Sequence, residues 1–419
     1  MYGFFRRIGP GFVTGAADDD PSGVATYSIA GARYGYKMNW MSLFLLPAMI
    51  AIQEMCGRVG LVTGRGLASV IKKYHSRRLM WFAVILLAVS NVINIGADLG
   101  IMAASLVMLL GLPYYFWLVV VALVIIVMEV GVPYKIYSNL LKWLGLSLLV
   151  YVATAFLAGQ NWGEVAFYTF IPHIELDMSY VMTLVGFIGT TISPFLFFWQ
   201  ASEEVEEEIA KERIADFDIK PRVSKKEIKI LGLDTKIGMI FSNMVTFFII
   251  LTTASTLHKN GIFSIETPQQ AAMALKPLAG NMAYLLFSVG IIGIGLQSIP
   301  VMAGSTGYAI ADALGIEVGL SKKLSKAKGF YAILAIAVIL GVLINLLNIN
   351  TMQALLYAAV VNGVMSVPLI FIIIKLANDK RIVGEYRSSR SSNIVAWITF
   401  GFMAFSVSLM IAGLFGLSF

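Results

Sequence analysis

The sequence predicts an all-α integral membrane protein of about 11 transmembrane helices, built as two inverted five-helix repeats in which helices 1 and 6 are broken. Three observations predict this fold class. The 419-residue chain is 58% hydrophobic and only 13% charged, whereas soluble domains average about 25% charged residues. Eleven mainly apolar runs have the length of about 20 residues that a helix needs to cross a bilayer. A proline beside small polar residues interrupts the first and the sixth run.

The same composition excludes several classes of protein. A soluble chain this apolar would expose large contiguous apolar patches and aggregate, which excludes a soluble multidomain enzyme. A disordered or nucleic-acid-binding protein is excluded as well, despite the net charge of +7. Cys56 is the single cysteine, so neither an intrachain disulfide nor a cysteine-based zinc site is expected. The N-terminal segment has no long apolar core before its acidic run, so we expect no cleavable signal peptide.

The segments that connect the apolar runs, called joints below, are too short to form a soluble domain. We therefore expect one transmembrane domain over residues 1–419, with repeat one at about 10–159, repeat two at about 179–376 and an additional helix at about 393–417. The largest joint, about 203–236, is highly charged and is predicted to be a solvated cytoplasmic segment that prolongs the sixth helix. The expected spans are about 10–32, 38–61, 79–110, 115–132, 138–159, 179–209, 234–257, 280–313, 329–347, 351–376 and 393–417.

The distribution of Lys and Arg predicts the orientation, because loops that carry these residues stay on the cytoplasmic side. With the N-terminus inside, only 4 of the 31 Lys and Arg residues lie outside, namely Arg33, Lys37, Lys259 and Lys276. The reverse topology would export nearly all of the positive charge. We therefore expect a cytoplasmic N-terminus and an external C-terminus.

The two interrupted runs contain the segments AADDDPSGVA and IGTTISPFLFF. Proline removes a helix donor and clashes with the preceding turn, and broken helix at membrane depth is tolerated only where it is buried or lines a wet cavity. The breaks lie five spans apart, an odd number that gives the two halves opposite topology. This pattern is typical of inverted-repeat transporters with a site between two discontinuous helices. Two ordinary proline kinks are the alternative.

Asp20 is the predicted charged ligand of that site, because it directly precedes Pro21, where the chain leaves helical geometry. A carboxylate at the bilayer centre costs about 3 kcal/mol on insertion scales and is therefore a functional candidate. Asp18 and Asp19 are expected to face a vestibule or a neighbouring helix. The alternative is that the acids cap the second half-helix, a role that is compatible with ion binding.

The other groups expected around Asp20 are oxygen donors, and neither break contains a thiolate, a thioether or an imidazole. Such ligands suit hard cations such as Mg²⁺, Ca²⁺ and Mn²⁺ rather than zinc or copper. The candidate donors are freed backbone carbonyls and the hydroxyls of Ser22, Thr190, Thr191 and Ser193.

The segment GPGFVTGAADDDPSGVATYSIAG resembles the first helix of NRAMP divalent-metal transporters, whose signature reads DPGN. The segment GFIGTTISPFLFFWQAS resembles the MPHN region of their sixth helix. With the matching eleven-span layout, the resemblance covers nearly the whole chain. It implies a LeuT-type 5+5 inverted repeat and a transporter that is not an enzyme.

Departures from the family pattern point to one branch of it. Ser193 stands in place of the metal-ligating Met and Gly23 in place of the ligating Asn. The other departures are Ser22 for Gly, Thr190 for an Ala whose carbonyl reaches the metal, Phe195 and Gln200 for two His, Ile95 for an acidic proton-pathway residue and Asp98 for Glu. This pattern resembles the NRAMP-related magnesium transporters, a bacterial branch that carries Mg²⁺ and also Mn²⁺ without proton coupling.

The chemistry of the replacements agrees with this branch. A thioether favours soft metals, so Ser193 removes a filter against Mg²⁺, and Gly23 is expected to widen the cavity. Mg²⁺ usually keeps several waters, so a hydrated ion is expected. The resemblance implies a metal site made of Ala17, Asp20, Gly23, Thr190, Thr191 and Ser193.

The expected function is a secondary transporter that moves divalent cations by alternating access in the plasma membrane of a prokaryote. Its expected partners are the cations and the lipid bilayer, with no nucleic acid and no cofactor apart from the transported ion; the oligomeric state stays open. The alternatives are a proton-coupled NRAMP importer of Mn²⁺ and Fe²⁺, a sodium-coupled organic-solute transporter on the same scaffold, a channel and a membrane-embedded enzyme. No HExxH or GxSxG motif supports the enzyme.

Single residues also have alternative roles. Ser193 is expected either to contact the ion's waters or only to bond a carbonyl one turn back. Asn91 and Asn94 are expected mainly to hold helices together. Asp98 is a possible proton acceptor.

Overall fold

The computed structural model describes residues 9–175 except 132–147, and residues 177–416. Helices make up most of this part of the chain, and it contains no β-strand. The helices of the N-terminal half are α2 (Pro10–Asp18), α3 (Pro21–Tyr34), α4 (Trp40–Thr63), α5 (Leu67–Tyr74), α6 (Arg77–Leu110), α7 (Tyr114–Gly131), α9 (Leu149–Leu157) and α10 (Trp162–Phe170). Those that follow are α11 (Met178–Thr191), α12 (Pro194–Ala210), α13 (Lys225–Thr256), α14 (Pro268–Ala272), α15 (Lys276–Ala279), α16 (Ala283–Leu314), α17 (Lys328–Ile344), α18 (Thr351–Asn378), α19 (Lys380–Val383) and α20 (Arg390–Leu414).

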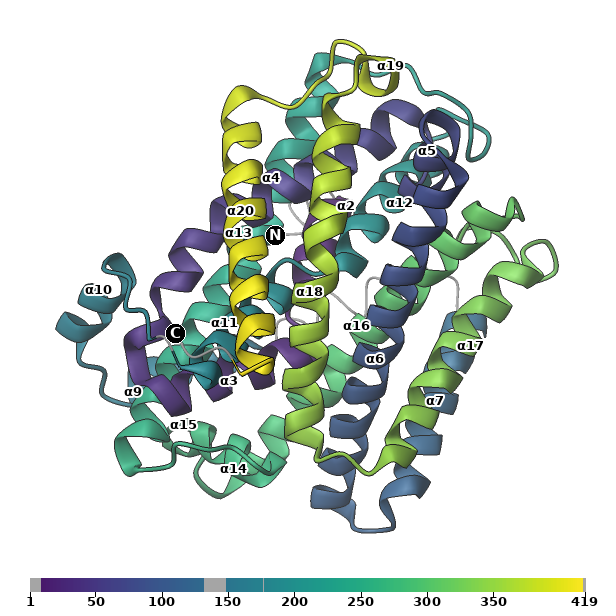
Figure 1. Cartoon of the computed structure of the whole chain (residues 1–419). Helices are drawn as coiled ribbons and strands as arrows, with labels where there is room; N and C mark the ends of the chain where they lie inside the picture. The colour runs from purple at the N-terminus through teal and green to yellow at the C-terminus, as the bar shows by residue number, and fades with distance from the viewer. Residues whose placement is uncertain (1–8, 132–147, 176, 417–419) are drawn as a thin grey trace.

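Short 3₁₀ turns join several of these helices. They are η1 (Gly35–Met38), η3 (His258–Asn260), η4 (Met273–Leu275), η5 (Gly280–Met282) and η6 (Asn345–Leu347). Figure 1 shows the long helices running roughly side by side, with α10, α14 and α15 gathered at one end of the bundle and α5 and α19 at the other.

Within the described residues, nine helical segments are long and apolar enough to cross a membrane. The predicted first span is present as the two half-helices α2 and α3. The predicted fifth span lies partly in 132–147, outside the described residues, and α9 forms its remaining part. The remaining predicted spans each match a helix, which confirms the membrane fold class.

Both predicted breaks are present. α2 ends at Asp18, and Asp20 then takes an extended conformation (φ −73°, ψ 169°) before Pro21 opens α3. α11 ends at Thr191, and Ser193 is extended (φ −82°, ψ 137°) before Pro194 opens α12. In both cases the fixed φ of proline suits the first position of a new helix, while its missing N–H ends the old one.

Two neighbouring helices pack against the broken ones through glycines. A Cβ on Gly15 of α2 would lie 2.3 Å from the carbonyl oxygen of Gly238 in α13, and a Cβ on Gly189 of α11 would lie 2.2 Å from the backbone N of Gly363 in α18. Since backbone meets backbone at both crossings, no larger residue fits. α13 therefore packs closely along the first broken helix and α18 along α11.

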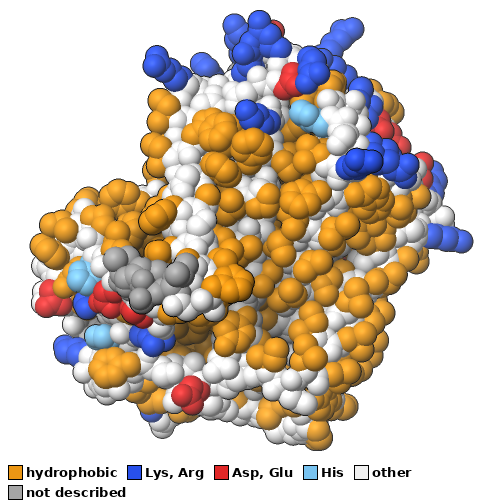
Figure 2. Space-filling view, viewed as in Figure 1, with side chains coloured by type: hydrophobic (Ala, Val, Ile, Leu, Met, Phe, Trp, Pro, Cys, Tyr) orange, Lys and Arg blue, Asp and Glu red, His pale blue; other side chains and the backbone are white. Residues whose placement is uncertain are grey.

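The outer surface carries many large apolar side chains, as expected of a protein surrounded by lipid. Ile85, Val127, Ile336 and Phe405 on α6, α7, α17 and α20 are each about half exposed or more. Figure 2 shows apolar side chains over most of the visible face, with Lys and Arg gathered at the end of the bundle where α5 and α19 lie.

The structure corrects the prediction for the charged joint after the sixth span. α12 does continue to Ala210, but four of its five glutamates are buried rather than solvated, because α12 packs against α4, α2 and α16. Helix α13 also begins nine residues earlier than expected, at Lys225, where Ser224 and Glu227 form a reciprocal capping box. The buried glutamates are Glu203, Glu204, Glu206 and Glu208.

Candidate functional site

The two helix breaks lie against each other in the interior of the bundle. The hydroxyl of Thr190, in the last turn of α11, is 3.4 Å from Oδ1 of Asp20. About two turns further along α3, the hydroxyl of Tyr27 is 3.0 Å from that of Thr191. The side chains on both sides are buried. The structure thus brings together residues that are 170 positions apart in the chain, at the place the sequence predicted.

Asp20 is the centre of this cluster and receives four donors. Its Oδ1 accepts a 2.6 Å bond from the backbone N–H of Gly23, which caps the start of α3. The Ser22 hydroxyl lies 2.9 and 3.0 Å from the two carboxylate oxygens. The amide of Asn94 donates to Oδ2 at 2.6 Å. Capping, one of the two roles predicted for the acids, is therefore confirmed for Asp20, and it leaves the carboxylate at the mouth of the helix break.

Proline frees one carbonyl at each break. In a helix the carbonyl of residue i bonds the N–H of residue i+4, so Pro21 leaves Ala17 and Pro194 leaves Thr190 without that donor. The Ser193 hydroxyl donates to the Thr190 carbonyl at 2.8 Å and lies 3.0 Å from that of Gly189. This is the carbonyl bond weighed as the alternative for Ser193. A hydroxyl that donates still keeps its lone pairs for another donor, such as a water on an ion.

Gly23 does not border open space in this conformation. A Cβ built on it would lie 2.9 Å from the Thr190 hydroxyl and 3.1 Å from Oδ1 of Asp20. The expected widening of the cavity is therefore absent here, because the neighbouring side chains close over Asp20.

Asn94 and Asn362 belong to this site, although the sequence singled out only the first, and mainly as a link between helices. The Asn362 amide donates to Oδ1 of Asn94 at 3.0 Å, and the Ser90 hydroxyl in turn donates to Asn362. These bonds turn the Asn94 amide nitrogen toward Asp20. The available signal was the spacing of Asn91, Asn94 and Asp98, which puts three polar side chains on one helix face.

Two further groups of α6 and α16 border the network. Oδ2 of Asp98 is 3.4 Å from the Asn94 amide nitrogen, and its other oxygen is buried without a partner. The Met302 sulfur is 3.2 Å from the same nitrogen, so a thioether does reach this network, although from α16 rather than from a break. Asn91 instead bonds the Met302 carbonyl and the Thr306 hydroxyl, which confirms it as a link between helices.

Asp18 and Asp19 face away from this network, toward α13. The Ser242 hydroxyl lies 2.7 Å from Oδ2 of Asp18 and 3.3 Å from Oδ1 of Asp19. Of the two predicted surroundings, a neighbouring helix is the correct one. Asn243, one residue further along α13, donates to the Ser42 carbonyl at 2.6 Å and so links α13 to α4.

The α2 half-helix is also fastened at its start. Asp234 of α13 accepts from the backbone N–H groups of Gly9 at 3.0 Å and Gly11 at 2.7 Å. Nearby, Gln200 of α12 donates to Glu204 at 2.8 Å. Asp234 and Glu204 are close enough for their carboxylates to interact electrostatically.

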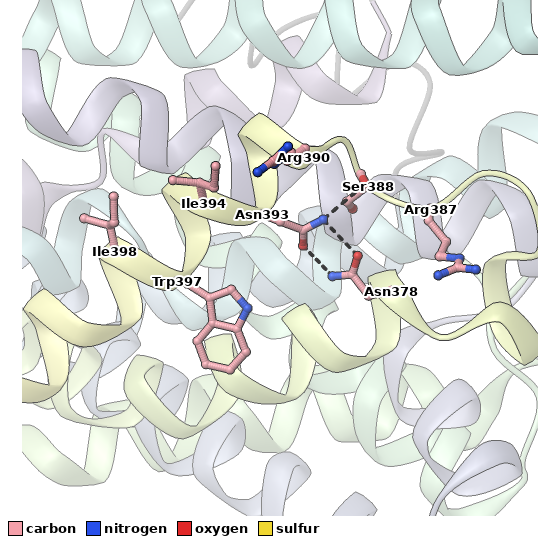
Figure 3. A pocket seen from close by; sticks show the side chains of 8 residues that line it. All are labelled: Asn378, Arg387, Ser388, Arg390, Asn393, Ile394, Trp397 and Ile398. Atoms are coloured by element: carbon pink, nitrogen blue, oxygen red, sulfur yellow. Dashed lines mark hydrogen bonds between the residues drawn. The ribbon is translucent and has the colours of Figure 1, made fainter.

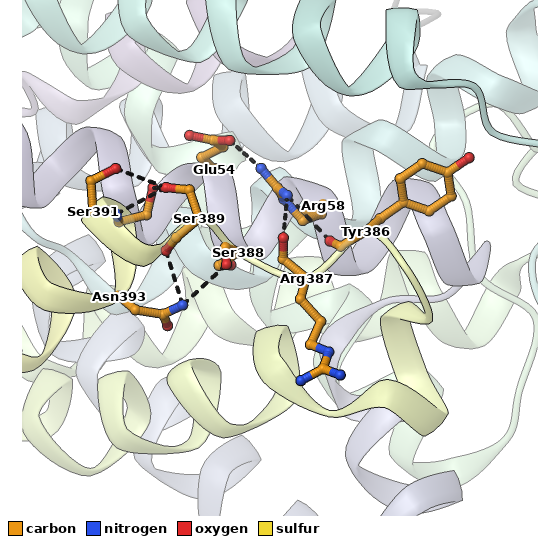
Figure 4. Close-up of polar contacts among 9 residues, drawn as sticks. Glu54, Arg58, Tyr386, Arg387, Ser388, Ser389, Ser391 and Asn393 are labelled. Atoms are coloured by element: carbon orange, nitrogen blue, oxygen red, sulfur yellow. Dashed lines mark hydrogen bonds and ion pairs between the residues drawn. The ribbon is translucent and has the colours of Figure 1, made fainter.

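Two polar features lie apart from the breaks. Arg58 of α4 pairs with Glu54 and donates to the carbonyls of Tyr386 and Arg387, which ties the segment before α20 to α4 (Figure 4). A cavity of about 680 Å³ opens beside α18 and α20 (Figure 3), but none of its lining residues belongs to the predicted site. Its lining residues are Asn378, Arg387, Ser388, Arg390, Asn393, Ile394, Trp397 and Ile398.

The described residues contain no group of three or more His, Cys, Asp or Glu side chains that are placed to hold a metal ion. A cation at Asp20 would therefore be held by one carboxylate together with hydroxyls, amides and carbonyls. Such a donor set carries one negative charge and consists mainly of hard oxygen donors.

Known proteins resemble this chain over nearly its full length. The family model described as natural resistance-associated macrophage protein-like (Nramp) matches residues 11–413. A divalent metal cation transporter, MntH, of Caldanaerobacter subterraneus subsp. tengcongensis is 22% identical over 96% of this chain and 91% of its own length. The MntH of Bacillus subtilis is 23% identical over 94% of this chain and 89% of its own length.

Solved structures show the same fold. The manganese transporter of Eremococcus coleocola superposes with a TM-score of 0.74 at 17% identity, covering 99% of this chain and 90% of its own. Mhp1, a nucleobase-cation-symport-1 transporter, superposes with a TM-score of 0.63 at 12% identity, covering 97% and 92%. The Nramp match spans both helix breaks and the network around Asp20, and on that ground the chain belongs to the Nramp family of membrane transporters rather than to a family of enzymes.

Proposed function

We propose that this protein transports divalent metal cations across the membrane, with Asp20 as the charged ligand, and that its cargo is Mg²⁺ with Mn²⁺ also carried. Family membership and the names of its relatives, which are divalent metal cation transporters, support the general activity. The observation that carries the proposal is a single buried carboxylate at the meeting point of two broken helices, surrounded by hydroxyls and amides.

The choice of a hard cation rests on Ser193. It stands where the resemblance places a metal-binding Met, and it supports the Thr190 carbonyl through a 2.8 Å hydrogen bond. A hydroxyl and a carbonyl attract hard ions, whereas a thioether favours softer transition metals. The thioether of Met302 contacts the Asn94 amide. The proposed ligands and neighbours of the ion are Ala17, Asp20, Gly23, Thr190, Thr191 and Ser193.

The ion enters the site partly hydrated and by alternating access. In this conformation Asp20 is 1% exposed and its lone pairs are occupied by Ser22, Gly23 and Asn94. The hydroxyls of Ser22 and Thr190 both donate and accept, so rotation exchanges a proton toward Asp20 for a lone pair toward the ion. We infer that this conformation is closed to both sides, and that movement of the half-helices admits and releases the ion.

Transport is proposed to need no proton. Phe195 and Gln200 do not titrate, and Ile95 stands where a relay acid is usual in the family. The membrane potential suffices to drive uptake, since a divalent cation crossing 100 mV gains about 4.6 kcal/mol. That energy supports roughly a thousand-fold accumulation, because about 1.4 kcal/mol corresponds to a factor of ten.

The proposed setting is the plasma membrane of a prokaryote, with the N-terminus in the cytoplasm and the C-terminus outside. The bacterial origin of the relatives supports the membrane. The gathering of Lys and Arg at the end of the bundle that holds α5 and α19 supports the orientation (Figure 2), because positive loops stay inside.

A proton-coupled Mn²⁺ importer is the second candidate. Asp98 favours it, since this buried carboxylate lies next to the Asn94 amide and keeps one oxygen without a partner. In that case Asp98 would take up a proton each time the ion binds at Asp20.

Uptake into proteoliposomes separates the two candidates. We expect the purified protein to carry Mg²⁺ and Mn²⁺ into vesicles under an imposed negative potential, without acidification of the lumen. Asp20→Ala should abolish this uptake, and Glu129→Gln, which alters a buried acid of α7 away from the breaks, should not. Uptake of amino acids instead of metal, or wild-type uptake by Asp20→Ala, would overturn the proposal.

A further inference from the structure

Asp18 and Asp19 are two buried acids that the proposed transport site does not use. Asp20 faces α6 and α11 through Asn94 and Thr190, whereas Asp18 and Asp19 face α13 through Ser242. The side chains of Asp18 and Asp19 are 0% and 1% exposed. The three consecutive acids therefore face two different groups of helices: Asp20 faces α6 and α11, and Asp18 and Asp19 face α13.

The hydrogen bonds on the α13 side do not satisfy two carboxylates. Ser242 carries one hydroxyl proton, which both acids share at 2.7 and 3.3 Å. Oδ1 of Asp18 and Oδ2 of Asp19 are buried without a partner. Among the ion pairs formed by the described residues, none involves either acid. Burying a carboxylate costs several kcal/mol unless a counter-charge or hydrogen bonds offset it, so this pair lacks a positive partner.

A third group points at the same place. Thr246 lies one helical turn after Ser242 on α13 and is fully buried, and its hydroxyl makes no hydrogen bond of standard geometry. That hydroxyl faces Asp19 and the Tyr27 hydroxyl. The α2 helix also ends at Asp18, so its last carbonyls add negative potential to this side. Carboxylates, hydroxyls and a half-helix C-terminus are the groups that coordinate cations inside membrane transporters.

We propose that Asp18 and Asp19, with Ser242 and Thr246, form a second site for a divalent cation, next to the one at Asp20 and facing α13. This inference rests on the proposed function, because the second ion is taken to be of the same class as the cargo. One divalent charge neutralises the two carboxylates, and the oxygen-only donors suit Mg²⁺ or Mn²⁺. Two ions on either side of one helix break repel each other, which favours release of the first.

Counting bound Mn²⁺ tests the second site. We expect the purified full-length protein to bind two Mn²⁺ ions per chain near neutral pH, measured from the electron paramagnetic resonance signal of the free ion. The double variant Asp18→Asn/Asp19→Asn should bind one ion and keep the site at Asp20. Asp20→Asn should lose the other ion, and Glu129→Gln, which changes another buried acid, on α7, should still bind two.

A gentler variant covers the case in which the double variant fails to fold. Ser242→Ala/Thr246→Val keeps both acids and removes only the hydroxyls, and it should weaken one of the two ions by about 10–100-fold, the usual effect of removing supporting ligands. Two bound ions of unchanged affinity in both α13-side variants would overturn the inference. So would a single bound ion in the wild type that only Asp20→Asn removes, the result expected if the two acids carry protons. Neither result touches the proposed function, which is overturned by wild-type uptake in Asp20→Ala or by uptake of amino acids instead of metal.

Discussion

The amide nitrogen of Asn94 lies 2.6 Å from Oδ2 of Asp20, which joins the middle of the 34-residue helix α6 to the break in the first span. This bond is the last in a chain that runs from Ser90 through Asn362 to Asn94. Each amide in the chain accepts on its oxygen and donates with its nitrogen, so the direction of the last bond is set by α18. The position of the Asp20 carboxylate therefore depends on three helices at once.

We predict that Asn94→Leu abolishes or strongly reduces Mn²⁺ uptake and destabilises the protein. Asp20 loses the amide donor on Oδ2, and the Asn362 amide is left buried without an acceptor, a loss of about 1–3 kcal/mol. Uptake kinetics and thermal unfolding in detergent measure the two effects.

Asn91→Leu is the matched control for that prediction. It removes an asparagine from the same helix face that bonds α16 and not Asp20. A similar loss of stability with uptake largely kept is the expected result. Equal loss of uptake in both variants would show that Asn94 acts only by holding helices together.

Much of the fold was predictable because the bilayer limits what a sequence can do. Apolar runs of sufficient length predicted the spans, and two helix-breaking prolines predicted the breaks. The distribution of Lys and Arg predicted the orientation. The burial of Glu203, Glu204 and Glu206 was not predictable in this way, because it depends on α12 packing against α2, α4 and α16. From sequence alone, a charged helix end is predicted to be exposed to solvent, because the helices that pack against it are not known.

The site was predictable where local chemistry decides it and not where distant partners do. Asp20 and the freed carbonyl of Thr190 follow from the prolines beside them. Asn362 has no local signal, since its role comes from reaching Asn94 across a helix interface, 268 residues away in sequence. The closed packing around Gly23 likewise depends on Thr190, which belongs to the other break.

Selectivity should change when the two replaced ligands are restored together. Gly23→Asn/Ser193→Met adds an amide oxygen and a thioether beside Asp20, and we expect the ratio of Mg²⁺ to Mn²⁺ uptake to fall. The thioether favours Mn²⁺ over Mg²⁺, and the added side chain leaves less room for bound water. Competition between the two ions in proteoliposomes measures the ratio.

Each single variant separates the two contributions. Gly23→Asn alone must push past the Thr190 hydroxyl, which a Cβ would meet at 2.9 Å, so we expect it to lower uptake of both ions. Ser193→Met alone should mainly raise the preference for Mn²⁺. An unchanged ratio in the double variant would count against Ser193 as the selectivity determinant.

The proton requirement is tested most sharply at Asp98. If transport is uncoupled, Asp98→Asn keeps Mg²⁺ entry driven by the membrane potential, and a pH dye inside the vesicles reports no acidification in either protein. The amide has the same size as the carboxylate and keeps an oxygen next to the Asn94 amide nitrogen. Acidification that tracks Mg²⁺ entry in the wild type and disappears in Asp98→Asn would instead establish Asp98 as the coupling residue.

Asp234 is predicted to hold the α2 half-helix in its closed position. Its carboxylate binds the N–H groups of Gly9 and Gly11 at the start of α2, and loss of such a cap costs about 0.5–2 kcal/mol. Asp234→Ala should therefore raise the opening of α2, by about tenfold for each 1.4 kcal/mol lost. Amide hydrogen exchange over Pro10–Asp18 measures this opening directly.

Asp177→Ala is the matched control, because Asp177 also accepts hydrogen bonds at a helix start, from Ser179 and Tyr180 of α11, but does not touch α2. Exchange in α2 should rise only in Asp234→Ala, and an equal rise in both variants would mean that the change reflects general loosening of the bundle rather than release of the half-helix that closes the path to Asp20.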